Sequence, residues 1–360
     1  MERAARNRAR GFTLIELLVS MALGLLVVGA MASLFKTGLN AMMLVTQRTE
    51  TQQNMRAAMD LMVKDISMAG AGLPSGGIQL PNGGGSSASK FACDQGGTCH
   101  VPAFNYPNNN YMYGIIPGFN NGVENNAVVA AAPPPVLNDS ITVVYADYNF
   151  PLWEYDITFP TPGNGGLINL APNPAFVPAP PLVTAAGGIQ AGDLVMLSNS
   201  LGTAVGEVTN LTPGSITFAD ADALNINQNG AAQNNIKTIS GGANTVAYRL
   251  FAVTYYLTVP GAGENPRLMR QVNGLNPVPV ADNIINLQFA YDTYNQAGGG
   301  ALDANQADPI GAGESLNLIQ KINIVLMGQS ILKSGANKSQ NMYLATAVSA
   351  RNMAFRNRYQ

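Results

Sequence analysis

The chain opens with a long apolar run. From residue 12 to residue 35 nearly every side chain is apolar, and a single carboxylate, Glu16, interrupts the run near its start. Residues 17–35 carry no charge over 19 positions. A helix of that length rises about 28 Å, close to the thickness of a bilayer core. The pattern therefore predicts a helix long enough to span a membrane.

The apolar pattern continues beyond Lys36 but becomes one-sided. Apolar residues recur at helical spacing on one face, at Met55, Met59, Met62, Val63 and Ile66. Charged residues form a second row four positions apart, at Arg56, Asp60 and Lys64. These two rows are typical of an amphipathic helix with one buried and one solvated face. Because no proline occurs between the run and Pro74, we expect one continuous helix over residues 12–69, about 85 Å long.

The rest of the chain has a different pattern. Residues 73–138 are rich in Gly, Pro and Asn, which favours irregular loops with some short strands. From residue 140 onward, short segments of alternating apolar and polar residues predict strands, at 140–146, 192–199, 203–211, 215–220, 245–259, 266–273, 283–294, 317–328 and 342–352. We expect eight to ten strands, forming an antiparallel sheet packed on the long helix. The predicted fold class is α+β.

The charges that flank the apolar run predict its orientation. Four arginines lie in the first ten residues, and Lys36 is the basic residue immediately after the run. The positive-inside rule then places the N-terminus in the cytoplasm and the bulk of the chain outside. The run is too long for the apolar part of an ordinary secretory signal. A plain anchor leaves Glu16 unexplained, unless its carboxylate snorkels to the headgroups, because a charge within a bilayer costs at least about 2.5 kcal/mol.

The segment RGFTLIELLV resembles the processing motif of type IV prepilins, in which a basic leader ends in Gly and Glu is the fifth residue of the mature chain. The resemblance implies cleavage between Gly11 and Phe12, N-methylation of Phe12, and an assembly role for Glu16. Its carboxylate would pair with the new amine at Phe12 of a neighbouring subunit. The implied partners are a prepilin peptidase/methyltransferase, the inner membrane, the major pilin, other minor pilins and an adhesin at the pilus tip. The chain would lie first in the inner membrane and then in a pilus at the cell surface.

The second half of the chain also resembles known pilin heads. The order AYRLFAVTYYL, PRLMRQV, NIINLQFAYD, INIVL and ATAVSARN, together with MDLMVKDISMAGAG before it, is similar to PilW-type minor pilins and to J-type pseudopilins of type II secretion. The length favours the PilW type. The expected division is leader 1–11, membrane or filament helix 12–35, amphipathic helix 36–70, loop-rich insertion 71–139 and β-rich head 140–360. A pseudopilin and a pilus-tip adhesin are the alternatives.

Composition narrows the possible chemistry. Only 11% of residues are charged, against 47% apolar, and the net charge is −2. A low fraction of charged residues is more typical of a secreted protein than of a cytosolic enzyme. The slight excess of acidic residues argues against a basic surface that would bind nucleic acid. With one histidine and two cysteines, a catalytic triad or Cys-His pair has few candidates. We therefore expect no enzymatic activity and no cofactor.

A few residues remain candidates for a site. Cys93 and Cys99 predict a disulfide, with free thiols or a poor metal site that includes His100 as alternatives. Two acidic segments are candidates for calcium binding. One contains Asp220 and Asp222, and the other runs from Asp303 to Glu314 and departs from an EF-hand loop at Ala307 and Asp308. Turn formation explains both segments better. Four aromatic residues are considered as an exposed binding surface or as packing, namely Tyr106, Tyr111, Tyr113 and Trp153.

Overall fold

The computed structural model describes residues 12–81, 88–101, 111–122, 137–160, 165–178, 188–261, 264–295, 301–330 and 340–356. Its first element is helix α1, Leu14–Ser67, which runs for 54 residues without a break. The helix ends at Met68, after which Gly70 adopts a positive φ of 74°. A residue with a side chain rarely takes that conformation, so the glycine lets the chain turn away from the helix axis. The long continuous helix is confirmed.

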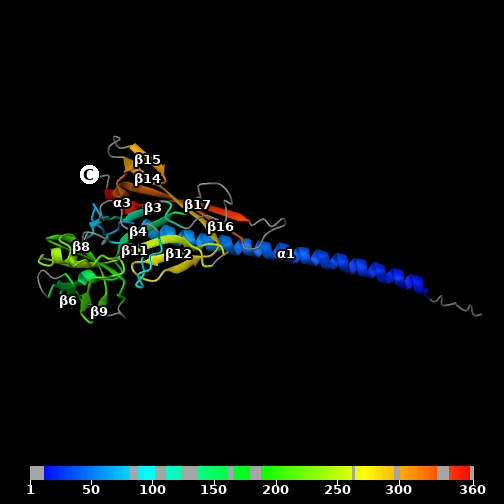
Figure 1. The fold of residues 1–360 in the computed structure, drawn as a ribbon, viewed down its shortest axis with the longest axis horizontal. Helices are drawn as coiled ribbons and strands as arrows, with labels where there is room; N and C mark the ends of the chain where they lie inside the picture. The colour runs from blue at the N-terminus through cyan, green and yellow to red at the C-terminus, as the bar shows by residue number, and fades with distance from the viewer. Residues whose placement is uncertain are drawn as a thin grey trace, which may run out of the picture.

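Figure 1 shows that α1 has two environments. Its first part projects from the head as a rod, and its second part runs into the head. No side chain between residues 12 and 50 is buried, and Thr51 is the first that is. Beyond it the predicted stripe packs inward, since Met55, Met59, Met62 and Ile66 are at most 4% exposed. The amphipathic half therefore belongs to the head.

Two antiparallel sheets pack on this buried half of α1. The larger contains β13 (Val278–Ala281), β12 (Arg267–Val272), β11 (Val246–Thr258), β4 (Ser140–Asp147) and β3 (Ile115–Gly118), with β7 (Leu194–Asn199) and β8 (Gly202–Glu207) joined through β11. The second has the order β15 (Ala301–Gln306), β14 (Ile284–Asn295), β16 (Ile319–Gln329) and β17 (Asn341–Ser349). Side chains from both sheets and from α1 form one core, which includes Met62, Tyr255 and Ile324.

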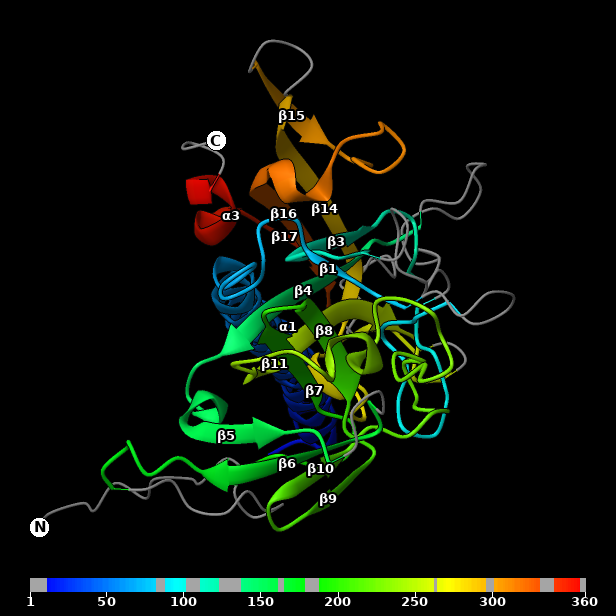
Figure 2. The same cartoon turned by 90° about the vertical axis from the view of Figure 1, so that its left-hand side faces the viewer.

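Two further sheets lie outside this core. One has the order β5 (Tyr155–Thr158), β6 (Leu167–Pro172), β10 (Ser215–Thr217) and β9 (Asn210–Thr212), and a pair is formed by β1 (Ile78–Gln79) and β2 (Tyr111–Met112). Figure 2 shows the β5–β9 sheet at one side of the head and β14 and β15 at the other, with β4 and β11 between them. Short helical turns complete the fold, at η1 (Leu152–Glu154), η3 (Ile236–Ile239), η4 (Leu316–Leu318) and α3 (Arg351–Arg356).

The predicted α+β fold, with a long helix packed on an antiparallel β-rich head, is confirmed, but the head has more strands than the eight to ten expected and divides them among several sheets. The described residues form seventeen strands in four sheets. The strands that the sequence pattern missed include β5, β6, β13 and β15, which are four to six residues long. Strands of this length give too few alternations to stand out, and β6 and β13 each contain a proline. Alternation also says nothing about which strands pair.

Candidate functional site

The free end of α1 holds the residues singled out by the processing motif. Phe12 is 84% exposed, and Gly11 lies outside the described residues. Thr13 caps the helix, and its side chain accepts a hydrogen bond from the Glu16 amide at 3.3 Å. In return the Glu16 carboxylate accepts bonds from the Thr13 amide at 2.9 Å and the Thr13 hydroxyl at 2.8 Å. This reciprocal capping box holds Glu16 in the first turn.

Sequence reasoning did not name Thr13. The signal was present, because Thr followed three positions later by Glu at the start of an apolar helix is the pattern of a capping box. Both bonds from Thr13 end on the same oxygen of Glu16, Oε2. The carboxylate is thus oriented by its own chain while it stays at the exposed surface of the helix.

The projecting part of α1 presents a continuous apolar surface. Large apolar side chains along it are more than half exposed, including Leu14, Leu25, Leu34, Met42 and Val45. Among the described residues, α1 is the one helix long and apolar enough to cross a membrane, judged by length and composition. Exposed apolar area of this extent marks a surface that lipid or other protein covers.

A buried polar cluster joins α1 to the head. Asp65, 4% exposed, lies on the buried face of the helix. Its carboxylate accepts hydrogen bonds from the Tyr255 hydroxyl at 2.6 Å, the Tyr145 hydroxyl at 3.0 Å and the Arg270 Nε at 2.8 Å. These three partners come from β11, β4 and β12 of the larger sheet. One helix carboxylate is therefore tied to three strands.

The tyrosines of this cluster act as neutral donors. Burial, followed by the nearby Asp65 carboxylate, raises the pKa of Tyr255 and of Tyr145 well above the ordinary value. Arg270 supplies the compensating charge that a buried carboxylate requires. The sequence held one signal for Asp65, since an aspartate three positions after Met62 falls on the apolar stripe. Nothing in the sequence pointed to its partners.

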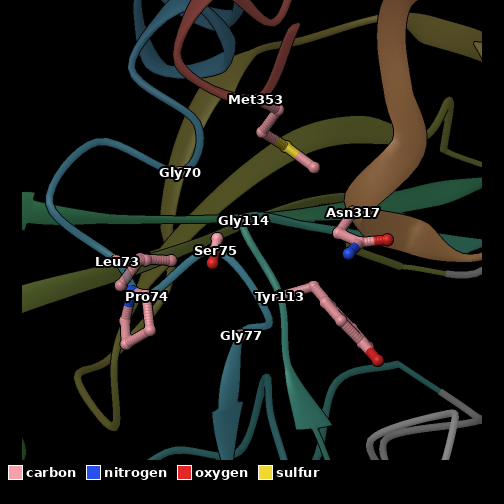
Figure 3. Close-up of a pocket in the computed structure, with 9 residues that line it drawn as sticks. All are labelled: Gly70, Leu73, Pro74, Ser75, Gly77, Tyr113, Gly114, Asn317 and Met353. Atoms are coloured by element: carbon pink, nitrogen blue, oxygen red, sulfur yellow. The ribbon is translucent and has the colours of Figure 1, made fainter. Parts of the chain in front are cut away.

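The C-terminal end of α1 is covered by the last described helix. Figure 3 shows Met353 of α3 above Gly70 and Gly114, beside a small pocket lined also by Tyr113 and Asn317. A Cβ atom on Gly114 would lie 2.6 Å from the Gly70 backbone nitrogen, so these two backbones meet only because glycine stands at the contact. The cavity holds about 20 Å³, room for one water molecule. It is a packing seam and not a ligand site.

The structure joins Cys93 and Cys99 by a disulfide. Next to it the imidazole Nε2 of His100 lies 2.9 Å from an Asp94 carboxylate oxygen, and the ring stacks on Tyr256. Gln95 in the disulfide loop donates a hydrogen bond to the Ala191 carbonyl just before β7. The loop is thereby attached to the larger sheet. Within the described ranges, no group of three or more His, Cys, Asp or Glu side chains is placed to hold a metal ion.

The two acidic segments have structural roles. Asp220 accepts hydrogen bonds from Asn229, and Asp222 accepts them from the amides of Ile226 and Asn227, so both close turns. The EF-hand reading of residues 303–314 is wrong, because Asp303 lies within strand β15. A strand cannot wrap its ligands around a cation as a calcium loop does.

The aromatic candidates do not converge on one site. Trp153 packs with Tyr148 and Tyr248, with ring centroids 5.8 and 6.0 Å away. Tyr111 instead stacks with Tyr113 at 5.7 Å, and Tyr106 lies outside the described residues.

An acid pair, buried Glu207 and half-buried Asp222, predicts that the stability of the head depends on pH. Glu207, 2% exposed at the end of β8, shares a hydrogen bond with Asp222 and accepts one from the Leu224 amide at 2.8 Å. Burial and the Asp222 charge raise the pKa of Glu207 from 4.5 to about 9. Glu207 is therefore protonated at neutral pH and donates to the Asp222 carboxylate. Stability is then greatest below the ordinary pKa of a glutamate and falls as pH rises toward the folded-state value.

The Glu207→Gln variant, which keeps a donor to Asp222, should show a flatter stability profile. Between pH 5 and pH 9 the unmodified protein should lose stability by up to about 1.4 kcal/mol per pH unit relative to the variant. Urea midpoints at several pH values measure this. Glu264→Gln, at an exposed glutamate, is the control that should leave the slope unchanged. Parallel profiles for the unmodified protein and Glu207→Gln would contradict the protonated state of Glu207.

Comparison with known proteins adds one finding. A family model of the prokaryotic N-terminal methylation motif matches residues 6–32. No curated protein and no solved structure matches the chain. The match covers the processing segment and the first part of α1, and it supports a type IV prepilin-like protein whose apolar helix fits membrane anchoring.

Proposed function

We propose that the chain is a PilW-like minor pilin, a non-enzymatic subunit that takes part in the assembly of a type IV pilus. One observation supports this above all others. The methylation motif opens directly into an exposed apolar helix, with Glu16 in its first turn and a large β-rich head at its other end. A helix of this kind has to be covered by lipid before assembly and by other helices afterwards.

In this proposal the leader is removed between Gly11 and Phe12, which creates an N-terminal amine on Phe12. A cation at that depth needs a counter-charge. Glu16 can supply this counter-charge to a neighbouring subunit because its carboxylate is exposed. The two bonds from Thr13 both end on Oε2, so Oε1 is the oxygen that would face the neighbour's amine. Thr13 therefore positions the carboxylate for the amine of the neighbour.

The proposed location follows from the same segment. The N-terminus lies in the cytoplasm, the apolar part of α1 spans the inner membrane, and the head lies in the periplasm before it joins the pilus. The proposed partners are the prepilin peptidase/methyltransferase, the major pilin and other minor pilins. The 15 helix residues from 36 to 50 rise about 22 Å and separate the membrane from the head.

Substitutions at two positions should separate processing from assembly. In cells that naturally carry the chain, Gly11→Ala should leave nearly all of the protein with its leader, whereas Glu16→Ala should be cut normally and lose most of its incorporation into sheared pili. Mass spectrometry of the N-terminus and immunoblots of sheared filaments measure the two steps.

Glu50→Ala is the matched control, since Glu50 is an exposed glutamate on the same helix. It should be processed and incorporated like the unmodified chain. If Glu16→Ala entered filaments at the unmodified level, or if Gly11→Ala were still cut, the proposed role would be wrong.

A further inference from the structure

We propose that the free edge of strand β17 is a docking site for an extended, uncharged strand of a neighbouring subunit. The inference rests on the proposed function, since it assumes that the chain works in an assembly. It concerns the head, whereas the processing motif concerns only the helix. The sheet of β15, β14, β16 and β17 has two outer strands that differ in length, charge and regularity.

Among the described residues, strand β17 shows no charge, proline, bulge or second paired strand that would protect its outer edge. Within the described part of the chain it pairs with β16 alone, over nine residues from Asn341 to Ser349 and without a break in register. Its sequence, NMYLATAVS, contains no charged residue and no proline. A long, regular and uncharged edge offers its backbone groups to another strand, and natural proteins avoid leaving such an edge exposed.

The opposite edge of the same sheet is protected. Strand β15 is six residues long, and its pairing with β14 is broken by a register shift between Tyr291 and Thr293. It also contains Asp303 and Asn305, and Asn305 adopts a positive φ of 57°. A bulge, a charge and an irregular backbone all discourage pairing with another chain. Because one sheet contains both kinds of edge, the open character of β17 is specific to that side.

The side chains of β17 are also incompletely covered. Met342 and Leu344 face the core but are only partly buried, whereas Ile324 and Leu326 on the neighbouring strand are 0% exposed. On the outer face Tyr343 is 70% exposed, and Val325, which pairs with Ala345 two positions further along β17, is 38% exposed. One further strand beside β17 would cover apolar surface on both faces of the sheet. Since this surface carries no charge, the matching strand is uncharged as well.

The direction of β17 indicates which chain supplies the strand. Figure 1 shows β17 running alongside α1 at the end of the head from which the helix projects. Pairing two copies of β17 antiparallel would point their two helices in opposite directions. Two subunits anchored in one membrane by the same processed end cannot adopt that arrangement. Parallel pairing of two β17 edges would need a two-fold axis along the strands, whereas the subunits of a helical filament meet through different surfaces. A strand of a different prepilin-like chain has neither restriction, so the proposed partner is such a chain.

Photo-crosslinking of the full chain in its own cells tests the proposal. The photoreactive amino acid p-benzoylphenylalanine replaces Tyr343 on β17 or, as the matched control, Leu302 on β15, which is 53% exposed. We expect position 343 to crosslink to one segment of a different chain that has its own prepilin motif, and position 302 not to. Ala345→Lys or Ala347→Lys, at exposed positions of β17, should abolish the crosslink, whereas Ala304→Lys on β15 should preserve it.

The other outcomes would overturn the inference. They are the absence of a crosslink, a crosslink to any segment of a second copy of this chain, an equal crosslink from position 302, and a crosslink that survives both lysine substitutions in β17. The N-terminus of the same protein is sequenced in every sample. Suppose that the chain is cut after Gly11 and needs Glu16 to enter pili, but position 343 gives no crosslink. That result rejects the docking site on β17 and leaves the proposed function standing. A chain that is not cut rejects the proposed function.

Discussion

Replacing Asp65 with alanine is expected to lower the free energy of unfolding of the head by about 3–5 kcal/mol. The substitution leaves the Arg270 guanidinium without its carboxylate and leaves the hydroxyls of Tyr145 and Tyr255 without an acceptor. Unpaired buried groups account for most of that cost, since the attraction within an intact buried pair is largely offset by its desolvation. Urea unfolding of the full chain in detergent, followed by tyrosine fluorescence, measures the change.

The control for this variant lies five positions earlier on the opposite, exposed face of α1. Asp60 is an exposed aspartate on the same helix, and Asp60→Ala should change the free energy of unfolding by less than about 0.5 kcal/mol. Tyr255→Phe should fall between the two, at about 1–2 kcal/mol, because it removes one hydrogen bond and leaves the ion pair. If Asp65→Ala and Asp60→Ala unfolded at the same urea concentration, the cluster would not hold the helix to the head.

Replacing Met62 with alanine is expected to cost about 2–5 kcal/mol. Met62 is 0% exposed and packs in the core shared by α1 and the two larger sheets. Truncation removes apolar contacts and leaves a cavity that the surrounding strands can fill only in part. The shift of the urea midpoint measures the loss.

Met42→Ala makes the same chemical change on the same helix, at a side chain that is 69% exposed. It should leave the unfolding of the head within about 0.5 kcal/mol of the unmodified protein. Equal losses from the two methionines would mean that the projecting part of α1 contributes to the head, against the burial seen here. The pair therefore tests whether the head is stabilised by the buried part of α1 and not by its projecting part.

The sequence predicted the parts of this fold that depend on local patterns. The 3.6-residue period of Met55, Met59, Met62 and Ile66 indicated the buried face of α1, and the structure buries these four side chains. The long strands β4, β11, β14 and β16 likewise stood out, because each offers enough alternating or β-branched positions to be recognised. Motifs read over a few neighbouring residues, such as the segment around Gly11 and Glu16, needed no knowledge of the tertiary structure.

The contacts that the sequence did not predict share one physical cause, which is that their residues lie far apart along the chain. The bonds of Asp65 to Tyr145, Tyr255 and Arg270 span 80, 190 and 205 positions. A pattern of neighbouring residues carries no information about such pairs. The same holds for the four sheets, since an alternating segment predicts a strand without naming its partner. The Glu207–Asp222 pair is a further case, because an acidic turn looks solvated until the fold buries it.

By itself, the sequence determined that a basic segment precedes an apolar helix, that Glu16 lies at the start of this helix and that a β-rich head follows. Each of these depends on composition or on periodicity within about 20 residues, which is the range over which a helix or a strand organises itself. Only the tertiary structure decided where α1 enters the head, which strands bind Asp65, and which outer strand of the β15, β14, β16 and β17 sheet is long, regular and paired with one strand among the described residues. Those features depend on contacts between distant segments, and such contacts exist only once the chain has packed.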